Sequence, residues 1–160
     1  MLTSLTPSEF FPSAMTHVAI AVFCGGLIGL ERQLRGKSVG IRHCIIIVLT
    51  SALLVDLGQT LTDTAGDPSR VMAAIVTGVG FLGAGVIMAQ GGRIQGITTA
   101  TLIWALAAIG IAIALNYGVT AIAVTLIILA VMLGADWAER RFARLRGNRA
   151  RRTRAGDGEG

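Results

Sequence analysis

Five long apolar segments follow one another along the chain, separated by short polar segments. They lie at about residues 14–30, 41–59, 69–89, 96–115 and 119–135. Each has about 17 to 21 residues, which is the length that an α-helix needs to cross the hydrocarbon core of a bilayer. The pattern therefore predicts an all-α membrane protein with a bundle of five transmembrane helices, preceded by residues 1–13 and followed by residues 136–160.

The third segment, within residues 67–92, separates small from bulky side chains. At 100° per residue its small residues share one face, and they are Ala73, Ala74, Thr77, Gly78, Gly80, Ala84 and Gly85. The bulky residues cover the other face, and they are Ile75, Val76, Val79, Leu82, Val86 and Ile87. A smooth face lets a neighbouring backbone approach closely in lipid, so we expect this helix at the centre of the bundle. Asp67 is its expected N-cap and Pro68 its first residue.

The composition excludes a soluble domain, because 53% of the residues are hydrophobic and 21 of 160 are glycine. Cys24 and Cys44 both fall in apolar segments, so we expect two small buried side chains and no structural disulfide.

The basic residues predict the orientation. The segment 31–43 carries four Lys or Arg residues against the single acid Glu31, and Arg93 lies in the short link 90–95. The segment 60–69 holds Asp63 and Asp67 and no basic residue. Basic loops stay in the cytoplasm, so the N-terminus should lie outside and the C-terminus inside. The first helix lacks the basic leader of a cleaved signal peptide and should stay attached.

The tail, residues 136–160, has eight arginines between Arg140 and Arg154. We expect a disordered cytoplasmic anchor that binds anionic lipid. Nucleic-acid binding is not expected, because Phe142 is the one aromatic residue among these arginines.

Polar residues within the apolar segments are candidate functional residues. The first segment carries a small-residue ridge of Ala21, Gly25 and Gly29, and His17 lies one turn before it. His17 is either a hydrogen-bonded residue near the membrane boundary or a proton or metal ligand. Asp56 is costly within a membrane, so it should face the bundle or reach the water of the headgroups.

Motifs of soluble enzymes fail here. The spacing Gly78-x-Gly80-x-x-Gly83 matches a dinucleotide-binding loop, but it lacks the preceding strand and the later acid. The Gly36-Lys37-Ser38 sequence lacks the first glycine of a phosphate-binding loop. We expect no catalytic residues, no metal site and no cofactor, and therefore no enzyme.

Four blocks in order carry a family resemblance: GGLIGLERQLRGKSVGIR at 25–42, DPSR at 67–70, GVGFLGAGVI at 78–87 and GITTATLIWALAAIG at 96–110. With them the chain resembles the MgtC/SapB family of bacterial inner-membrane proteins over most of residues 21–115. The family's usual core has five membrane helices. The resemblance implies adaptation to low magnesium and, in pathogens, survival inside macrophages. It also implies regulation of the membrane sector of the ATP synthase rather than pumping.

The resemblance singles out a set of residues without assigning them individual roles. They are Glu31, Arg32, Gly40, Arg42, Asp67, Pro68, Arg70, Gly78, Gly80, Gly83, Gly85, Gly96, Thr98, Thr99 and Trp104. Longer members resemble the same core followed by a soluble ACT-like domain, which we expect to be lacking from this short form.

Two functions stay open. In the first, the protein is a regulator whose glycine faces dock on a partner's membrane helices, pack internally or support a homo-oligomer; the residues are Gly25, Gly29, Gly78, Gly80, Gly83 and Gly85. In the second, it is a conduit for Mg²⁺ or H⁺, lined by Asp56, Asp63, Asp67, Thr98, Thr99 and Thr101. Magnesium prefers about six oxygen ligands, so a conduit would need several chains, and we favour the regulator.

Basic residues next to the first helix carry a separate prediction. We expect Arg32 and Arg42 to pair with Glu31 or with lipid phosphate, and Arg35 and Lys37 to serve topology alone.

Overall fold

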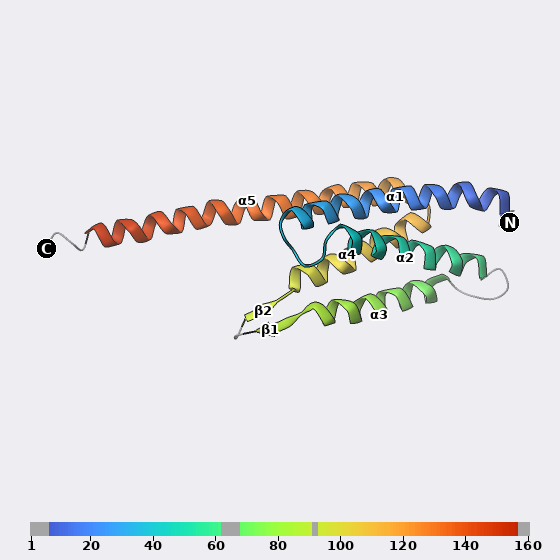
Figure 1. Ribbon diagram of the computed structural model, residues 1–160, viewed down its shortest axis with the longest axis horizontal. Helices are drawn as coiled ribbons and strands as arrows, with labels where there is room; N and C mark the ends of the chain where they lie inside the picture. The colour runs from blue at the N-terminus through green and yellow to red at the C-terminus, as the bar shows by residue number, and fades with distance from the viewer. Residues whose placement is uncertain (1–6, 62–67, 91–92, 157–160) are drawn as a thin grey trace. The chain divides into compact units, whose positions relative to one another are not determined.

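The structure is a computed structural model that describes residues 7–61, 68–90 and 93–156. Its elements in chain order are α1 (Pro7–Leu34), α2 (Ile41–Leu61), α3 (Pro68–Val86), β1 (Met88–Gln90), β2 (Arg93–Gln95), α4 (Ile97–Ala114) and α5 (Gly118–Gly156) (Figure 1). Within the described part, five stretches are long and apolar enough to cross a membrane: Ala14–Leu34, Ile41–Gln59, Ser69–Val86, Ile97–Ala114 and Gly118–Ala135. The protein is therefore a helical, multi-pass membrane protein, as the hydrophobic pattern predicts.

The chain forms two compact units, Met1–Thr125 and Leu126–Gly160. The first unit holds α1 to α4 with the hairpin and the beginning of α5. The second unit consists of the remainder of α5, where large apolar side chains such as Val131 and Leu133 are exposed. Such exposure suits a helix surrounded by lipid.

Helices α2 and α4 form the middle of the first unit, because each of them contacts the other and also both α1 and α3. Their contact is close at Gly110, where an added Cβ would lie 2.4 Å from the carbonyl oxygen of Val48. The largest fully buried apolar side chains come from α1, α2 and α4, and they are Ile28, Val48, Val55, Leu106, Ile109 and Ile113. These side chains form the apolar core between α1, α2 and α4.

Helix α3 is not the centre of the bundle, so that expectation is wrong. It packs mainly on α4 through its bulky side, where Ile75 and Val79 are buried. Its small-residue face is exposed instead. Lipid and protein are equally apolar neighbours for a bulky side chain, so the sequence pattern did not reveal which face turns inward.

A short hairpin replaces the expected end of the third helix at residue 89. Strands β1 and β2 are antiparallel, with Met88 opposite Gln95 and Gln90 opposite Arg93. The hairpin returns the chain to Gly96, which precedes α4 with φ of 92°. The positive φ favours glycine at this position, where an added Cβ would also lie 2.0 Å from the carbonyl oxygen of Val86.

Two other helix limits differ from the expectation. Helix α1 begins at Pro7 and ends at Leu34, and α5 continues to Gly156 through the tail that we expected to be disordered. Alanine, arginine and glutamate dominate residues 138–146, and all three favour helices. Within α5 the guanidinium of Arg141 lies 5.2 Å from the ring centre of Trp137, a cation–π contact one turn apart.

Candidate functional site

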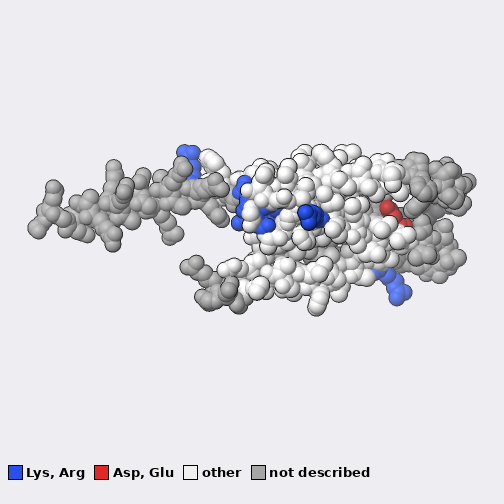
Figure 2. Space-filling model, in the orientation of Figure 1, with Lys and Arg blue, Asp and Glu red and all other residues white. Residues whose placement is uncertain are grey.

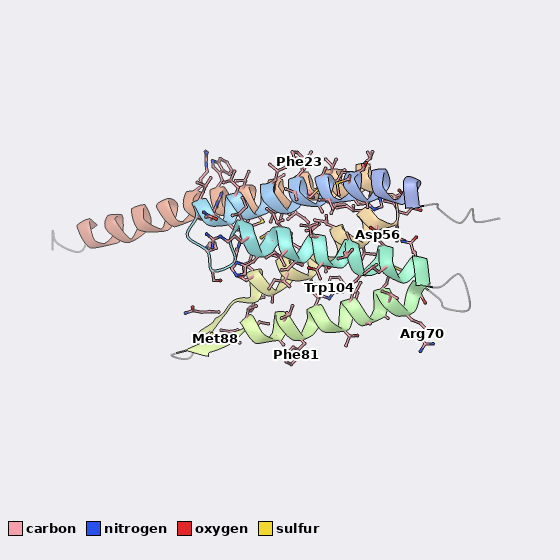
Figure 3. The ribbon with its side chains drawn as sticks, turned by 45° about the vertical axis from the view of Figure 1, so that its right-hand side comes forward. Phe23, Asp56, Arg70, Phe81, Met88 and Trp104 are labelled. Carbon is pink, nitrogen blue, oxygen red and sulfur yellow. The ribbon has the colours of Figure 1, made fainter. Side chains whose placement is uncertain are left out.

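Three polar side chains from distant parts of the chain meet near one end of the first unit, and we call them the His17 cluster. Nδ1 of His17 on α1 lies 3.1 Å from Oδ2 of Asp56 on α2. Nε2 of the same ring lies 3.3 Å from Oδ1 of Asn116, in the turn between α4 and α5. The side chains of His17 and Asp56 are only 12% and 15% exposed. Asp56 therefore faces the bundle, which is one of the two positions expected for it (Figure 3).

Two hydrogen-bonding arrangements fit the contacts of the His17 ring. In the observed geometry both partners of the ring offer oxygen acceptors, so only the doubly protonated imidazolium can donate to both. Turning the amide of Asn116 would present its NH₂ group to Nε2, and the neutral ring would then fit. Asn116 itself has φ of 64°, which asparagine tolerates better than most residues.

A second polar group lies about 22 Å away along α1, and we call it the Arg32 cluster: Glu31, Arg32, Arg35 and Thr99. Nη2 of Arg32 donates a hydrogen bond of 2.7 Å to Oγ1 of Thr99 on α4. Glu31 instead forms an ion pair with Arg35, one turn further along α1. Arg35 thus has an acidic partner in its own helix, and Arg32 does not form an ion pair with Glu31.

Burial distinguishes Arg32 from the other basic residues near this end. Arg32 is 2% exposed, whereas Lys37 and Arg42 are exposed. Figure 2 shows that several Lys and Arg side chains reach the surface of the molecule. Nε of Arg32 is buried and has no hydrogen-bond partner among the described residues. The carboxylate oxygens of Glu31 are buried as well, and Oε1 faces Nε of Arg35 as an ion pair without the geometry of a hydrogen bond. The Arg32 cluster is thus a buried charged group rather than a solvated surface.

The residues of the expected cation path do not form one site in the described part of the chain. Asp56 pairs with His17, whereas Thr99 accepts from Arg32 near the opposite end of the bundle. Thr101 donates to the carbonyl of Ile97 in its own helix, and Thr98 is exposed. Asp63 and Asp67 lie outside the described residues. Within the described ranges, no three His, Cys, Asp or Glu residues come together to hold a metal.

The glycines separate into two groups. Gly25 and Gly29 let α1 pack closely on α2. An added Cβ would lie 2.8 Å from Cα of Ile45 at Gly25 and 2.4 Å from Cα of Ile41 at Gly29, so neither position has room for a side chain. Gly83 faces Ala100 of α4, with 3.7 Å between its added Cβ and the alanine Cβ. Gly78, Gly80 and Gly85 would meet nothing within 4 Å.

The three open glycines belong to what we call the open α3 face. Its exposed members are Ala73, Ala74, Thr77, Gly78, Gly80, Phe81, Ala84 and Gly85. At 100° per residue Phe81 lies near the middle of this face, and it is 80% exposed. Figure 3 shows the Phe81 side chain directed away from the other helices. The open α3 face is therefore a smooth surface with one large aromatic side chain at its middle.

Three further residues of the family motifs, Arg70, Gly40 and Trp104, are members of neither cluster. Arg70 is exposed at the beginning of α3 and points away from the bundle in Figure 3. Gly40 lies beside Gln33, with 3.4 Å between its added Cβ and Oε1. Trp104 is half exposed and borders a shallow apolar groove between α3 and α4 with Val76, Val79, Ala107 and Ala108.

Sequence reasoning missed the pairing of His17 with Asp56, which are 39 positions apart. Counting helical turns from the loop between the first two helices would have indicated it. His17 lies about five helical turns and Asp56 about four turns from the loop between α1 and α2, so an antiparallel pair of helices places them at similar depth. The partner of Arg32 carries no such signal, because three threonines of α4 lie near that depth.

Comparison with known proteins gives a family and no solved structure. A family model described as the MgtC family matches residues 18–141. The chain is 40% identical over 124 residues to a protein of Escherichia coli named "Putative magnesium transporter YhiD", covering 71% of this chain and 57% of that protein. It is 39% identical over 119 residues to "Protein MgtC" of Salmonella typhimurium, covering 74% and 50%. An uncharacterized Haemophilus influenzae protein is 37% identical over 144 residues, covering 82% and 60%. No solved structure matches. The chain thus spans about half to three fifths of these relatives.

Proposed function

Because this chain belongs to the MgtC family, we propose that it is a non-enzymatic regulator of the bacterial inner membrane that docks on the membrane helices of a partner. The expected partner is the membrane sector of the ATP synthase, and the expected setting is growth at low magnesium. The names of its relatives connect the family with magnesium. The proposed orientation has the N-terminus outside and the basic C-terminal tail in the cytoplasm.

The open α3 face is the observation that carries this proposal. Membrane helices associate where small residues let two backbones approach, and Gly78, Gly80 and Gly85 offer such a surface without a neighbour within 4 Å among the described residues. The hydroxyl of Thr77 is satisfied by the carbonyl of Ala73, so it needs no outside partner. Phe81 offers the large aromatic anchor that often dominates an interface.

The first test is ATP hydrolysis by the synthase in inverted membrane vesicles, with and without this protein. Obstruction of the rotary machine by a docked regulator should lower hydrolysis. No change would contradict docking on the synthase. A rise would indicate that the proton gradient is being dissipated, which favours a conduit.

The second test asks whether the open α3 face is the docking surface. Gly78→Leu and Gly85→Leu place bulk on this face without an internal clash, and Phe81→Ala removes the anchor. Each should weaken the inhibition at least about tenfold. Gly134→Leu is the matched control, because this glycine of α5 also has nothing within 4 Å. Equal inhibition by all variants would refute the proposed surface.

A cation conduit is the second candidate function, and the His17 cluster is the observation that favours it. A buried histidine beside a carboxylate is an arrangement that can pass a proton. If Asp56 belongs to such a path, Asp56→Asn should abolish proton leak through vesicles that contain the purified protein. Unaltered leak with the variant correctly inserted would remove Asp56 from the path.

A further inference from the structure

The guanidinium of Arg32 is buried and forms no ion pair with a carboxylate among the described residues. It is 2% exposed, its Nη2 donates to the neutral hydroxyl of Thr99, and its Nε has no hydrogen-bond partner within the described residues. A guanidinium has five donors and a permanent positive charge. Burying such a group costs several kcal/mol unless an anion compensates it. The site therefore calls for a negative charge.

The neighbouring acid does not supply that charge. Glu31 precedes Arg32 in the chain, but its carboxylate pairs with Nε of Arg35. In the described part of the chain no carboxylate forms an ion pair with Arg32. The positive guanidinium of Arg32 would repel a cation, so the ligand that fits this side chain is an anion.

The beginning of α4 adds a second attraction for an anion. Helix α4 has 18 residues and begins at Ile97, and Thr99 lies in its first turn. Its N-cap is Gly96, which makes no side-chain capping bond. The first N–H groups of a helix have no partner within the helix, and the helix dipole makes this end positive. Arg32 thus reaches toward a helix end that itself favours an anion.

We propose that Arg32, Thr99 and the first turn of α4 bind a phosphate group. The planar fork of an arginine fits two phosphate oxygens, and free N–H groups at a helix end bind phosphate in many proteins. Two sources share this chemistry: the headgroup of a phospholipid at the membrane boundary and a soluble phosphate. Thr98, which precedes Thr99 in the first turn of α4, is exposed. The open α3 face plays no part in this proposal.

Binding to the purified protein in detergent tests the proposal. Phosphatidylglycerol retention is measured by native mass spectrometry, and inorganic phosphate binding by calorimetry with chloride as the reference anion. We expect one saturable site for at least one of the two probes. Retained phosphatidylglycerol without phosphate binding identifies a lipid site, and the reverse identifies a soluble ligand. Binding of neither probe to the wild-type protein would overturn the proposal.

Three variants assign the binding to this site. Arg32→Lys keeps the charge but loses the planar guanidinium that can donate to two phosphate oxygens, so the affinity for the probe that binds should fall at least about tenfold. Thr99→Val removes the hydroxyl and should weaken binding severalfold, which keeps the test decisive if the arginine variant does not fold. Lys37→Gln removes an exposed charge near the same end and should bind as the wild type does. Equal loss in Lys37→Gln, or none in the folded Arg32 or Thr99 variant, would refute the assignment.

Discussion

At the scale of single residues, contact between backbones decides which glycines matter. Gly26 and Gly29 lie in the same helix, α1, and are three positions apart. An added Cβ at Gly29 would lie 2.4 Å from Cα of Ile41, whereas at Gly26 it would meet only the flexible end of Ile45, at 3.9 Å. Backbone atoms cannot move aside as a side-chain end can. The two glycines therefore have different roles in one helix.

The first prediction follows from this difference. Gly29→Ala should lower the free energy of unfolding by about 2 kcal/mol, because α1 and α2 must separate to admit the methyl group. Gly26→Ala should leave stability unchanged or raise it by up to about 1 kcal/mol through helix propensity. Unfolding in detergent, followed by circular dichroism, measures both. Equal stability of the two variants would contradict the packing of α1 on α2.

The second prediction concerns the coupling between His17 and Asp56. Their 3.1 Å contact is largely shielded from water, so we expect a coupling free energy of about 1 kcal/mol. A double-mutant cycle with His17→Gln and Asp56→Asn measures it. His43→Gln is the control, because His43 is exposed near the opposite end of α2 and should add to Asp56→Asn without coupling. A coupling as small as in the control cycle would show that the pair does not act together.

At the scale of elements, the sequence predicted what depends on local chemistry. Pro68 begins α3, as the preference for proline in the first helical turn predicts, and the five apolar stretches are helices. The hairpin was missed because Met88 and Ala89 continue the apolar pattern of α3. The face of α3 that packs on α4 was not predicted, because in a membrane either its small or its bulky face can be buried against protein while the other contacts lipid. The sequence supplied Arg32, Asp56 and their partners His17 and Thr99 as separate candidates, but not the pairing, because the two members of each pair belong to different helices.

The third prediction concerns the junction between the hairpin and α4. Gly96→Ala combines a left-handed φ with an added Cβ 2.0 Å from the carbonyl oxygen of Val86, so it should cost more than about 3 kcal/mol. Gly36→Ala shares the positive φ, at 63°, but meets nothing within 4 Å, so its cost should be about 1 kcal/mol. Hydrogen exchange of the amides of α4 should rise strongly in the first variant alone. Similar exchange in both would show that the junction is not tightly packed.

At the scale of the whole molecule, charge and burial together make the orientation testable. Lys37 lies between α1 and α2, and Tyr117 lies between α4 and α5, and both side chains are exposed. An odd number of helices separates these positions, so they should lie on opposite sides of a membrane. Basic residues surround Lys37, which favours the cytoplasm for that loop.

The fourth prediction uses a maleimide that cannot cross membranes. Cys24 and Cys44 are fully buried, so the wild-type protein should remain unlabelled and serve as its own control. Tyr117→Cys should be labelled in intact spheroplasts, and Lys37→Cys only after the membrane is opened. The reverse pattern would place the N-terminus in the cytoplasm and move the Arg32 cluster to the outer leaflet. Labelling of both variants in intact cells would be incompatible with three membrane crossings between them. The result therefore also decides whether the phosphate proposed at Arg32 must come from the cytoplasmic side.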